Sequence, residues 1–183
     1  MNVHGSSNGN GIQGRPLDHD VHLQVDEKDG EALISPVGSS MAVVDKLGDL
    51  LRGEMSAVEA YDLVLSASHP QGMEHILREL RDNHDHRVSL LRDRIRRYGG
   101  APPPSSGAWG VIAKTLQRGA DCLGIRAAAL MLEEGEKHGV RLYAAERVAP
   151  DLETSRWVHE VLFPEQQKTE HLCREIVRLT EDR

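Results

Sequence analysis

Two glutamates occupy matching places in a short internal repeat, and both could take part in chemistry. Glu54 is followed seven residues later by Tyr61, and Glu136 is followed seven residues later by Tyr143; a glycine precedes each glutamate. Seven residues make two turns of a helix, so each glutamate shares a helix face with its tyrosine. Side chains of these types on one face favour a polar core, either a metal site or a hydrogen-bond network.

Both helix faces are otherwise apolar. Residues spaced by three and four positions around the first glutamate are Leu47, Leu51, Val58, Tyr61 and Leu65, and those around the second are Leu132, Val140 and Tyr143. This spacing is typical of a helix that faces the core of a bundle. An unpaired carboxylate in a core is costly, and two facing carboxylates would also repel each other. Each glutamate therefore needs a cation, a hydrogen-bond donor or a metal ion as its partner.

Two histidines extend this pattern. His84 lies in the apolar stripe of a second helix, with Leu80 and Val88 one turn away on either side. His171 lies in the last helix, about 100° from the stripe that we expect there. Each half of the chain thus offers a glutamate with its tyrosine and then a helix with a histidine. Together the four residues supply the oxygen and nitrogen ligands that iron, zinc or manganese accept.

Composition excludes several classes of partner. The net charge of the 183 residues is −7, and basic residues are interspersed with acidic ones, which argues against a nucleic-acid partner. No apolar run approaches the roughly 20 residues that span a bilayer, and residues 1–35 lack the pattern of a signal peptide. We therefore expect a cytoplasmic protein with no membrane partner. Cys122 and Cys173 make no CxxC spacing and are expected to be free thiols.

The chain divides into a tail and one domain. Residues 1–38 are rich in Gly, Asn, Ser, Asp and His and show no periodicity, which predicts a disordered N-terminal tail. Residues 39–183 are expected to form a bundle with four long helices. The predicted helices run from Ser39 or Ser40 to about Ser68, from Pro70 to Gly99, from Gly124 to about Val148 and from Asp151 to about Glu181.

Two further features concern the helix connections. Between the second and third helices lie some 25 residues, with a proline run in residues 101–107 and a short apolar segment from Trp109 to about Cys122. This length suits a connection that travels along the bundle before the third helix begins. Pro164 lies within the fourth helix, and it is predicted to kink that helix or to divide it.

The chain resembles the ferritin-like superfamily, most closely the rubrerythrin-related bacterial bundles of unknown function. The resemblance covers about residues 40–180 and rests on an ordered set of segments: GEMSAVEAY, NHDHRVSLL leading to GGAPPPSSGAWG, LEEGEKHGVRLY and LFPEQQKTEHL. It implies an all-α fold, a ferritin-like four-helix bundle with a crossover connection and a short extra helix between helices two and three.

The resemblance also implies a metal site. In metal-binding ferritin-like proteins, helices one and three each give a glutamate, and helices two and four each give a Glu-x-x-His pair that bridges two irons. The positions that match as ligands are Glu54, His84, Glu136 and His171, and Tyr61 and Tyr143 would be hydrogen-bond partners of these ligands.

The two bridging carboxylates are replaced by cations. Arg81 stands three residues before His84, and Lys168 stands three residues before His171. Glu133, one turn from Glu136, and Glu165, on the expected stripe of the last helix, are the candidate substitutes.

Two interpretations follow from this departure. In the first, the Glu/His core is a degenerate di-iron site that binds no metal, and Arg81 and Lys168 or another arginine neutralise its carboxylates. In the second, the core holds iron or another divalent metal at low nuclearity, as in a stress-response protein of rubrerythrin type. An oxidase or peroxidase is not expected under either, because that chemistry needs two metals bridged by carboxylates. A homo-oligomer is compatible with both.

Overall fold

The computed structural model describes Met1 and residues 37–66, 72–107, 110–145 and 149–181. The predicted N-terminal tail, residues 1–38, lies almost entirely outside the described residues. Gly38–Arg183 form one compact unit. Every regular element in the described part of the chain is helical, which confirms the all-α class. The elements are α1 (Val37–Ser66), α2 (Met73–Arg97), α3 (Gly110–Tyr143), α4 (Leu152–Trp157), the π-helical turn η2 (Val158–Leu162) and α5 (Phe163–Glu181).

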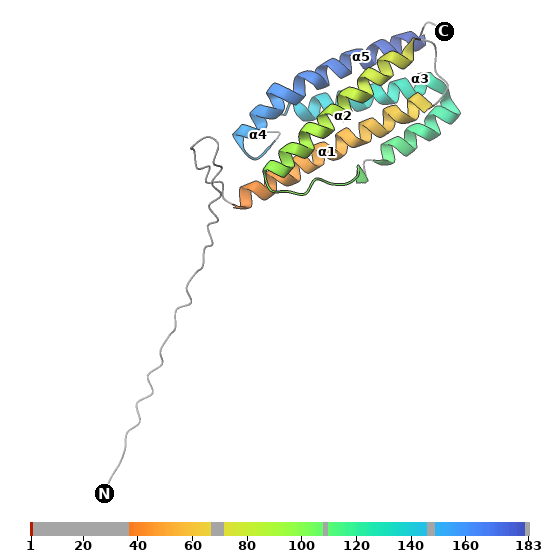
Figure 1. The fold of residues 1–183 in the computed structure, drawn as a ribbon. Coiled ribbons are helices and arrows are strands. Elements are labelled where there is room, and N and C mark those ends of the chain that lie inside the picture. Colours follow the sequence, from red (N-terminus) through yellow and green to blue (C-terminus); the bar gives the residue numbers. More distant parts are fainter. Residues whose placement is uncertain (2–36, 67–71, 108–109, 146–148, 182–183) are drawn as a thin grey trace. The chain divides into compact units, whose positions relative to one another are not determined.

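The helices lie side by side as a bundle (Figure 1). α5 packs against both α2 and α3. Their apolar stripes bury two clusters of side chains, one around Leu77, Leu80 and Ile176 and the other around Leu47, Leu91 and Leu162. No helix among the described residues is both long enough and apolar enough to cross a membrane.

The connection after α2 follows α1. Gly100 lies so close to Val44 that a Cβ atom added to the glycine would come within 2.6 Å of Val44 Cγ1. Further along, the Ser106 hydroxyl donates hydrogen bonds to the carboxylate of Glu59, at 2.8 and 2.9 Å. These two contacts are fifteen residues apart on α1, so the connection runs along that helix in the same direction.

α3 consists of two helical parts. Gly124 separates them with φ 78° and ψ 177°, a conformation that side chains other than glycine rarely adopt. The predicted start of a long helix near Gly124, after a shorter segment, is therefore confirmed. The long part ends at Tyr143 instead of the predicted Val148, which lies outside the described residues.

The predicted interruption at Pro164 is present, although the chain stays helical from Leu152 to Glu181: α4 ends at Trp157, the turn η2 follows, and α5 begins at Phe163. Proline has no backbone N–H and crowds the preceding turn, so an α-helix cannot continue through it unchanged. The π-helical turn η2 precedes Pro164, and its last hydrogen bond joins the N–H of Phe163 to the carbonyl of Val158, five residues back. This turn holds one residue more than an α-helical turn, and it changes which residues of α5 face the core.

Candidate functional site

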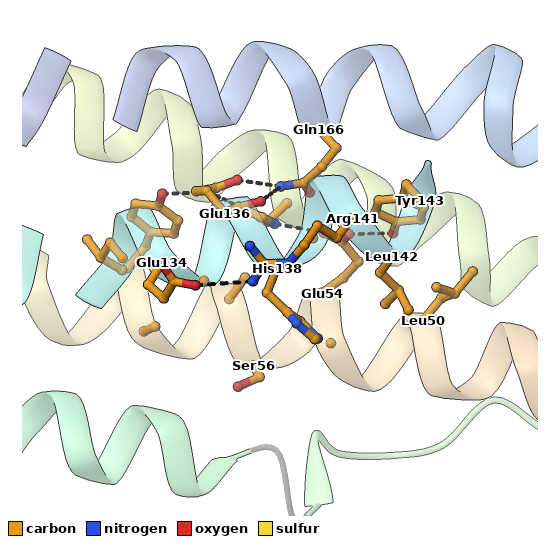
Figure 2. Close-up of a pocket in the computed structure, with 18 of the residues that line it drawn as sticks. Leu50, Glu54, Ser56, Glu134, Glu136, His138, Arg141, Leu142, Tyr143 and Gln166 are labelled. Atoms are coloured by element: carbon orange, nitrogen blue, oxygen red, sulfur yellow. Dashed lines mark hydrogen bonds and ion pairs between the residues drawn. The ribbon is translucent and has the colours of Figure 1, made fainter. Parts of the chain in front are cut away.

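The bundle brings five of the predicted site residues into one buried cluster. They come from α1 (Glu54 and Tyr61), α2 (His84) and α3 (Glu136 and Tyr143), and none is more than 4% exposed. Tyr143 donates a hydrogen bond to Glu54 Oε1 at 2.5 Å, and Tyr61 donates one to Glu136 Oε1 at 2.7 Å (Figure 2). Each tyrosine thus binds the glutamate of the other repeat, so the repeat links α1 to α3 twice.

His84 lies between the two glutamates. Its Nδ1 is 2.7 Å from Glu54 Oε2, and its Nε2 is 2.8 Å from Glu136 Oε1. An ionised carboxylate only accepts hydrogen bonds, so the ring can donate to both glutamates only as the doubly protonated imidazolium. The two repeats are therefore joined through a third helix by a bridging cation.

Arg87 completes the charge balance, and sequence reasoning missed it. Its side chain is fully buried, and its Nε donates to Glu54 Oε2 at 3.0 Å. Nη1 donates to Asn83 Oδ1 at 2.6 Å, and Nη2 donates to Gln166 Oε1 at 3.0 Å. A signal was present, because position 87 is one turn after His84 on the same face of α2. Two carboxylates, one guanidinium and one imidazolium sum to zero charge.

α5 supplies the remaining donors. Gln166 Nε2 donates to Glu136 Oε2 at 2.5 Å, and the Thr169 hydroxyl donates to the same oxygen at 2.8 Å. Gly139 makes this contact possible, because a Cβ atom there would lie 2.6 Å from Gln166 Nε2. Every carboxylate oxygen of both glutamates therefore accepts at least one hydrogen bond. We call the buried group Glu54, Tyr61, His84, Arg87, Glu136, Tyr143, Gln166 and Thr169 the network.

The network keeps both carboxylates ionised. Burial alone would raise the pKa of Glu54, but the charges of Arg87 and His84 and the hydrogen bonds from His84 and Tyr143 lower it to about 2. The pKa of Glu136 is also lowered, since burial is outweighed by the charge and hydrogen bond of His84 and by the Tyr61 hydroxyl. Burial beside these carboxylates raises the pKa of both tyrosines, which remain neutral donors.

The same carboxylates hold a proton on His84. Burial and the nearby Arg87 guanidinium lower the pKa of the imidazole, but Glu136 and Glu54 outweigh them and raise it above its usual value. Arg87 Nη2 lies 2.7 Å from His84 Nδ1. His84 Nδ1 can therefore accept a hydrogen bond from Arg87 when the ring is neutral, and it can donate to Glu54 when the ring is protonated.

The other predicted ligands lie outside the network. His171 is exposed on the outer side of α5. Glu133 forms an ion pair with Lys137 at 3.1 Å, and Glu165 accepts a hydrogen bond from Asn83 at 2.5 Å. The expected stripe of the last helix ran through Glu165, Leu172 and Ile176. Ile176 is buried and Leu172 packs against the core, but Glu165 is only half-buried. Gln166, Thr169 and Cys173 face the core on the other turns of α5.

The two cations expected to neutralise the core lie at the surface. Arg81 pairs with Asp62 at 3.1 Å, and Lys168 pairs with Glu79 at 3.0 Å; the two basic side chains are 33% and 52% exposed. Of the predicted alternatives, the one of another arginine holds, because Arg81 and Lys168 do not neutralise the buried glutamates. Arg87 and His84 do so instead, because they lie on the buried face of α2.

The arrangement of the network does not fit a metal ion. Both nitrogens of His84 already face carboxylates, and the Arg87 guanidinium fills the space beside Glu54 that a metal would need. Among the residues that the structure describes, no three His, Cys, Asp or Glu side chains are placed to hold one ion. The donors and acceptors of the network already pair with each other, so these groups are not arranged as the ligands of a metal ion.

A cavity of about 440 Å³ adjoins the network between α1 and α3. Glu54, His84, Glu136 and both tyrosines of the network line it, as do apolar side chains that include Leu50, Leu132 and Leu142. Figure 2 shows Glu54, Glu136 and Tyr143 on its inner side, with His138 and Arg141 nearby. Its size lies within the range of small-molecule sites.

No known family model matches the chain, and comparisons with curated proteins and with solved structures give no significant match. A functional interpretation therefore rests on the network and the cavity.

Proposed function

We propose that this chain is a ferritin-like, rubrerythrin-related bundle in which the network takes the place of a di-iron centre, and that it acts as a binding or structural protein without redox turnover. The observation that carries the proposal is the fully buried Arg87 guanidinium beside Glu54. A fixed positive charge at this place offsets the carboxylates as a metal ion would.

The positions of the buried residues support the ferritin-like part of the proposal. Single glutamates come from α1 and from the long part of α3, and a histidine from α2 bridges them. The connection between α2 and α3 runs along α1 and leads into a short helical part that ends at Gly124. Both features are expected of a ferritin-like bundle with a crossover connection.

The energetics of the network favour a structural role. A buried charge that loses its partner costs several kcal/mol, so any slip of one helix past another would be penalised. The network joins α1, α2, α3 and α5 through hydrogen bonds of 2.5 to 3.0 Å. We propose that it fixes the register of these helices, as buried polar groups do in some bundles.

The second candidate function is a metal-binding stress-response protein with a low-nuclearity site. Its supporting observation is that Glu54, His84 and Glu136 converge at one place with tyrosines as hydrogen-bond partners. Arg87 weighs against it, because a guanidinium and a divalent cation would compete for the same carboxylate.

Metal analysis distinguishes the two. The full chain, purified without chelator, is analysed for metals and then melted with added iron(II), manganese(II) or zinc(II). We expect no stoichiometric metal and no rise in Tm. The variant Arg87→Ala leaves Glu54 short of a cation, so we expect a metal-dependent rise in Tm for it but not for Arg78→Ala, a surface control on α2. Stoichiometric metal in the natural chain, lost on Glu54→Ala, would contradict the proposal.

A further inference from the structure

The cavity between α1 and α3 is bordered by glycines that the fold itself does not require. Gly53 and Gly135 lie within helices and line the cavity, yet a Cβ atom added to either would meet no atom of the described residues within 4 Å. Glycine in a helix interior costs about 1 kcal/mol relative to alanine. Gly139, by contrast, is needed for the close approach of Gln166. The absence of side chains at positions 53 and 135 keeps space open beside the network at a cost in stability.

The inner side of the cavity offers hydrogen-bond acceptors. Among the described residues, Glu54 Oε1 accepts a hydrogen bond from Tyr143 only, so it can accept a second. The Tyr143 hydroxyl donates its proton to Glu54, and its lone pairs remain able to accept. A ligand that reaches this end of the cavity must therefore bring donors.

The acceptors of the lining favour an amino group. Of the described lining residues, four are carboxylates, namely Asp49, Glu54, Glu134 and Glu136, and each has a cationic partner. Arg52 pairs with Asp49 and Arg141 with Glu134, both at 3.1 Å, and His84 and Arg87 contact the glutamates of the network. These charges balance, so the acceptors Glu54 Oε1 and the Tyr143 oxygen decide which ligand fits. An ammonium group can donate to both of them, whereas a carboxylate has no donor to offer.

We propose that this cavity binds a small organic amine, a protonated amino group on a compact apolar body. The apolar body would contact Leu50, Leu132 and Leu142, and the amino group would donate to Glu54 Oε1 and the Tyr143 oxygen. This inference goes beyond the proposed function, because it requires the cavity but makes no claim about metal. If the chain carried a metal and still bound the amine, the proposed function would be contradicted and the amine-binding site would stand.

The test uses three probes with the same naphthalene body: 1-naphthylmethylamine, 1-naphthalenemethanol and 1-naphthoate. Isothermal titration of the full chain measures the affinity for each. We expect the amine to bind with one molecule per chain, the alcohol to bind at least tenfold more weakly, and the naphthoate to show no binding. Equal affinity for the three probes, preference for the naphthoate, or no binding of the amine would overturn the proposal.

Glycine variants locate the bound amine. Gly53→Leu and Gly135→Leu place side chains in the cavity, and each is expected to weaken amine binding at least tenfold. Gly48→Ala is the matched control on α1, because Gly48 does not line the cavity and its added Cβ would make only ordinary contacts, the closest at 3.7 Å. If a leucine variant fails to fold, Gly53→Ala replaces it as a smaller substitution that also lies in the cavity. Amine affinity that both cavity variants leave unchanged would place the amine elsewhere and refute the inference.

Discussion

His84 and Arg87 lie one turn apart on α2, and the guanidinium Nη2 is 2.7 Å from the imidazole Nδ1 inside the bundle core. Two basic side chains in contact would repel each other if both were charged. Here Glu54 contacts both of them, and Glu136 contacts the far side of the imidazole. The pair therefore depends on carboxylates from two other helices, which makes the network sensitive to the loss of any one member.

Replacing Arg87 by methionine should lower the free energy of unfolding by about 3–5 kcal/mol, because Glu54 would stay buried without its guanidinium partner. Urea denaturation followed by circular dichroism measures the change. Arg78→Met on the same helix removes only an exposed ion pair with Glu74 and should cost at most about 1 kcal/mol. Similar losses of unfolding free energy in the two variants would mean that the buried pair stabilises the bundle no more than the exposed pair does.

The hydroxyl of Tyr143 should matter more than that of Tyr98. Tyr143 donates to a buried carboxylate, a kind of hydrogen bond worth about 1.5–3 kcal/mol, so Tyr143→Phe should reduce stability by that amount. Tyr98 shares a hydrogen bond with the neutral Thr154 hydroxyl, and Tyr98→Phe should cost about 0.5–1.5 kcal/mol. A double-mutant cycle with Glu54→Gln should give a non-zero coupling energy for Tyr143, and additive effects would argue against the contact.

Stability should decrease toward both ends of the pH range. The lowered pKa of Glu54 means that its contribution is complete above about pH 4.5 and is lost as the pH falls toward 2. The raised pKa of His84 means that its contribution is complete below about pH 6.5 and is lost as the pH rises through the pKa of the folded state.

Urea denaturation across the pH range checks the second effect. In His84→Gln the free energy of unfolding should fall less steeply as the pH rises. In His86→Gln, which changes an exposed histidine on the same helix, the decrease should stay as in the natural chain. An unchanged slope in His84→Gln would show that another group causes the decrease.

Gly139→Ala should destabilise the bundle, and Gly53→Ala should not. A Cβ at position 139 would push Gln166 away from Glu136, leaving a buried carboxylate oxygen with one donor fewer, at a cost of about 1–3 kcal/mol. At position 53 the added methyl meets no atom of the described residues, so the helix propensity of alanine should stabilise the bundle by up to about 1 kcal/mol. Thermal melts of the two variants give the comparison, and equal effects would contradict the close approach at Gly139.

The thiol of Cys173 should be unreactive in the native state. Burial near Glu136 raises its pKa to about 12, so almost no thiolate forms at pH 8. A disulfide reagent added to a Cys122→Ser variant should react only at the rate of unfolding. Reaction as fast as in the denatured chain would show that the side chain is accessible.

Helical periodicity alone identified Glu54, His84 and Glu136 as core residues, because polar side chains in an apolar stripe are conspicuous. It failed for Arg87, since a charged residue beside such a stripe usually points to solvent. It also placed Glu165 on the core face of α5 and missed Gln166 and Thr169, and it gave no sign of the π-helical turn that precedes them. The cavity could not be foreseen, because it depends on how far α1 and α3 stand apart around two glycines.

The extra residue of the π-helical turn determines which side chains of α5 reach the core. If the same residues wound as an uninterrupted α-helix, α5 would rotate by about 100°. Glu165 and Lys168 would then turn toward Glu136, in place of the neutral pair Gln166 and Thr169. Deleting one residue from Val158–Leu162 would instead convert the π-helical turn into an α-helical turn and leave Gln166 and Thr169 facing the core. The path of the backbone, and not only the choice of side chains, therefore keeps a carboxylate and an ammonium group out of the network.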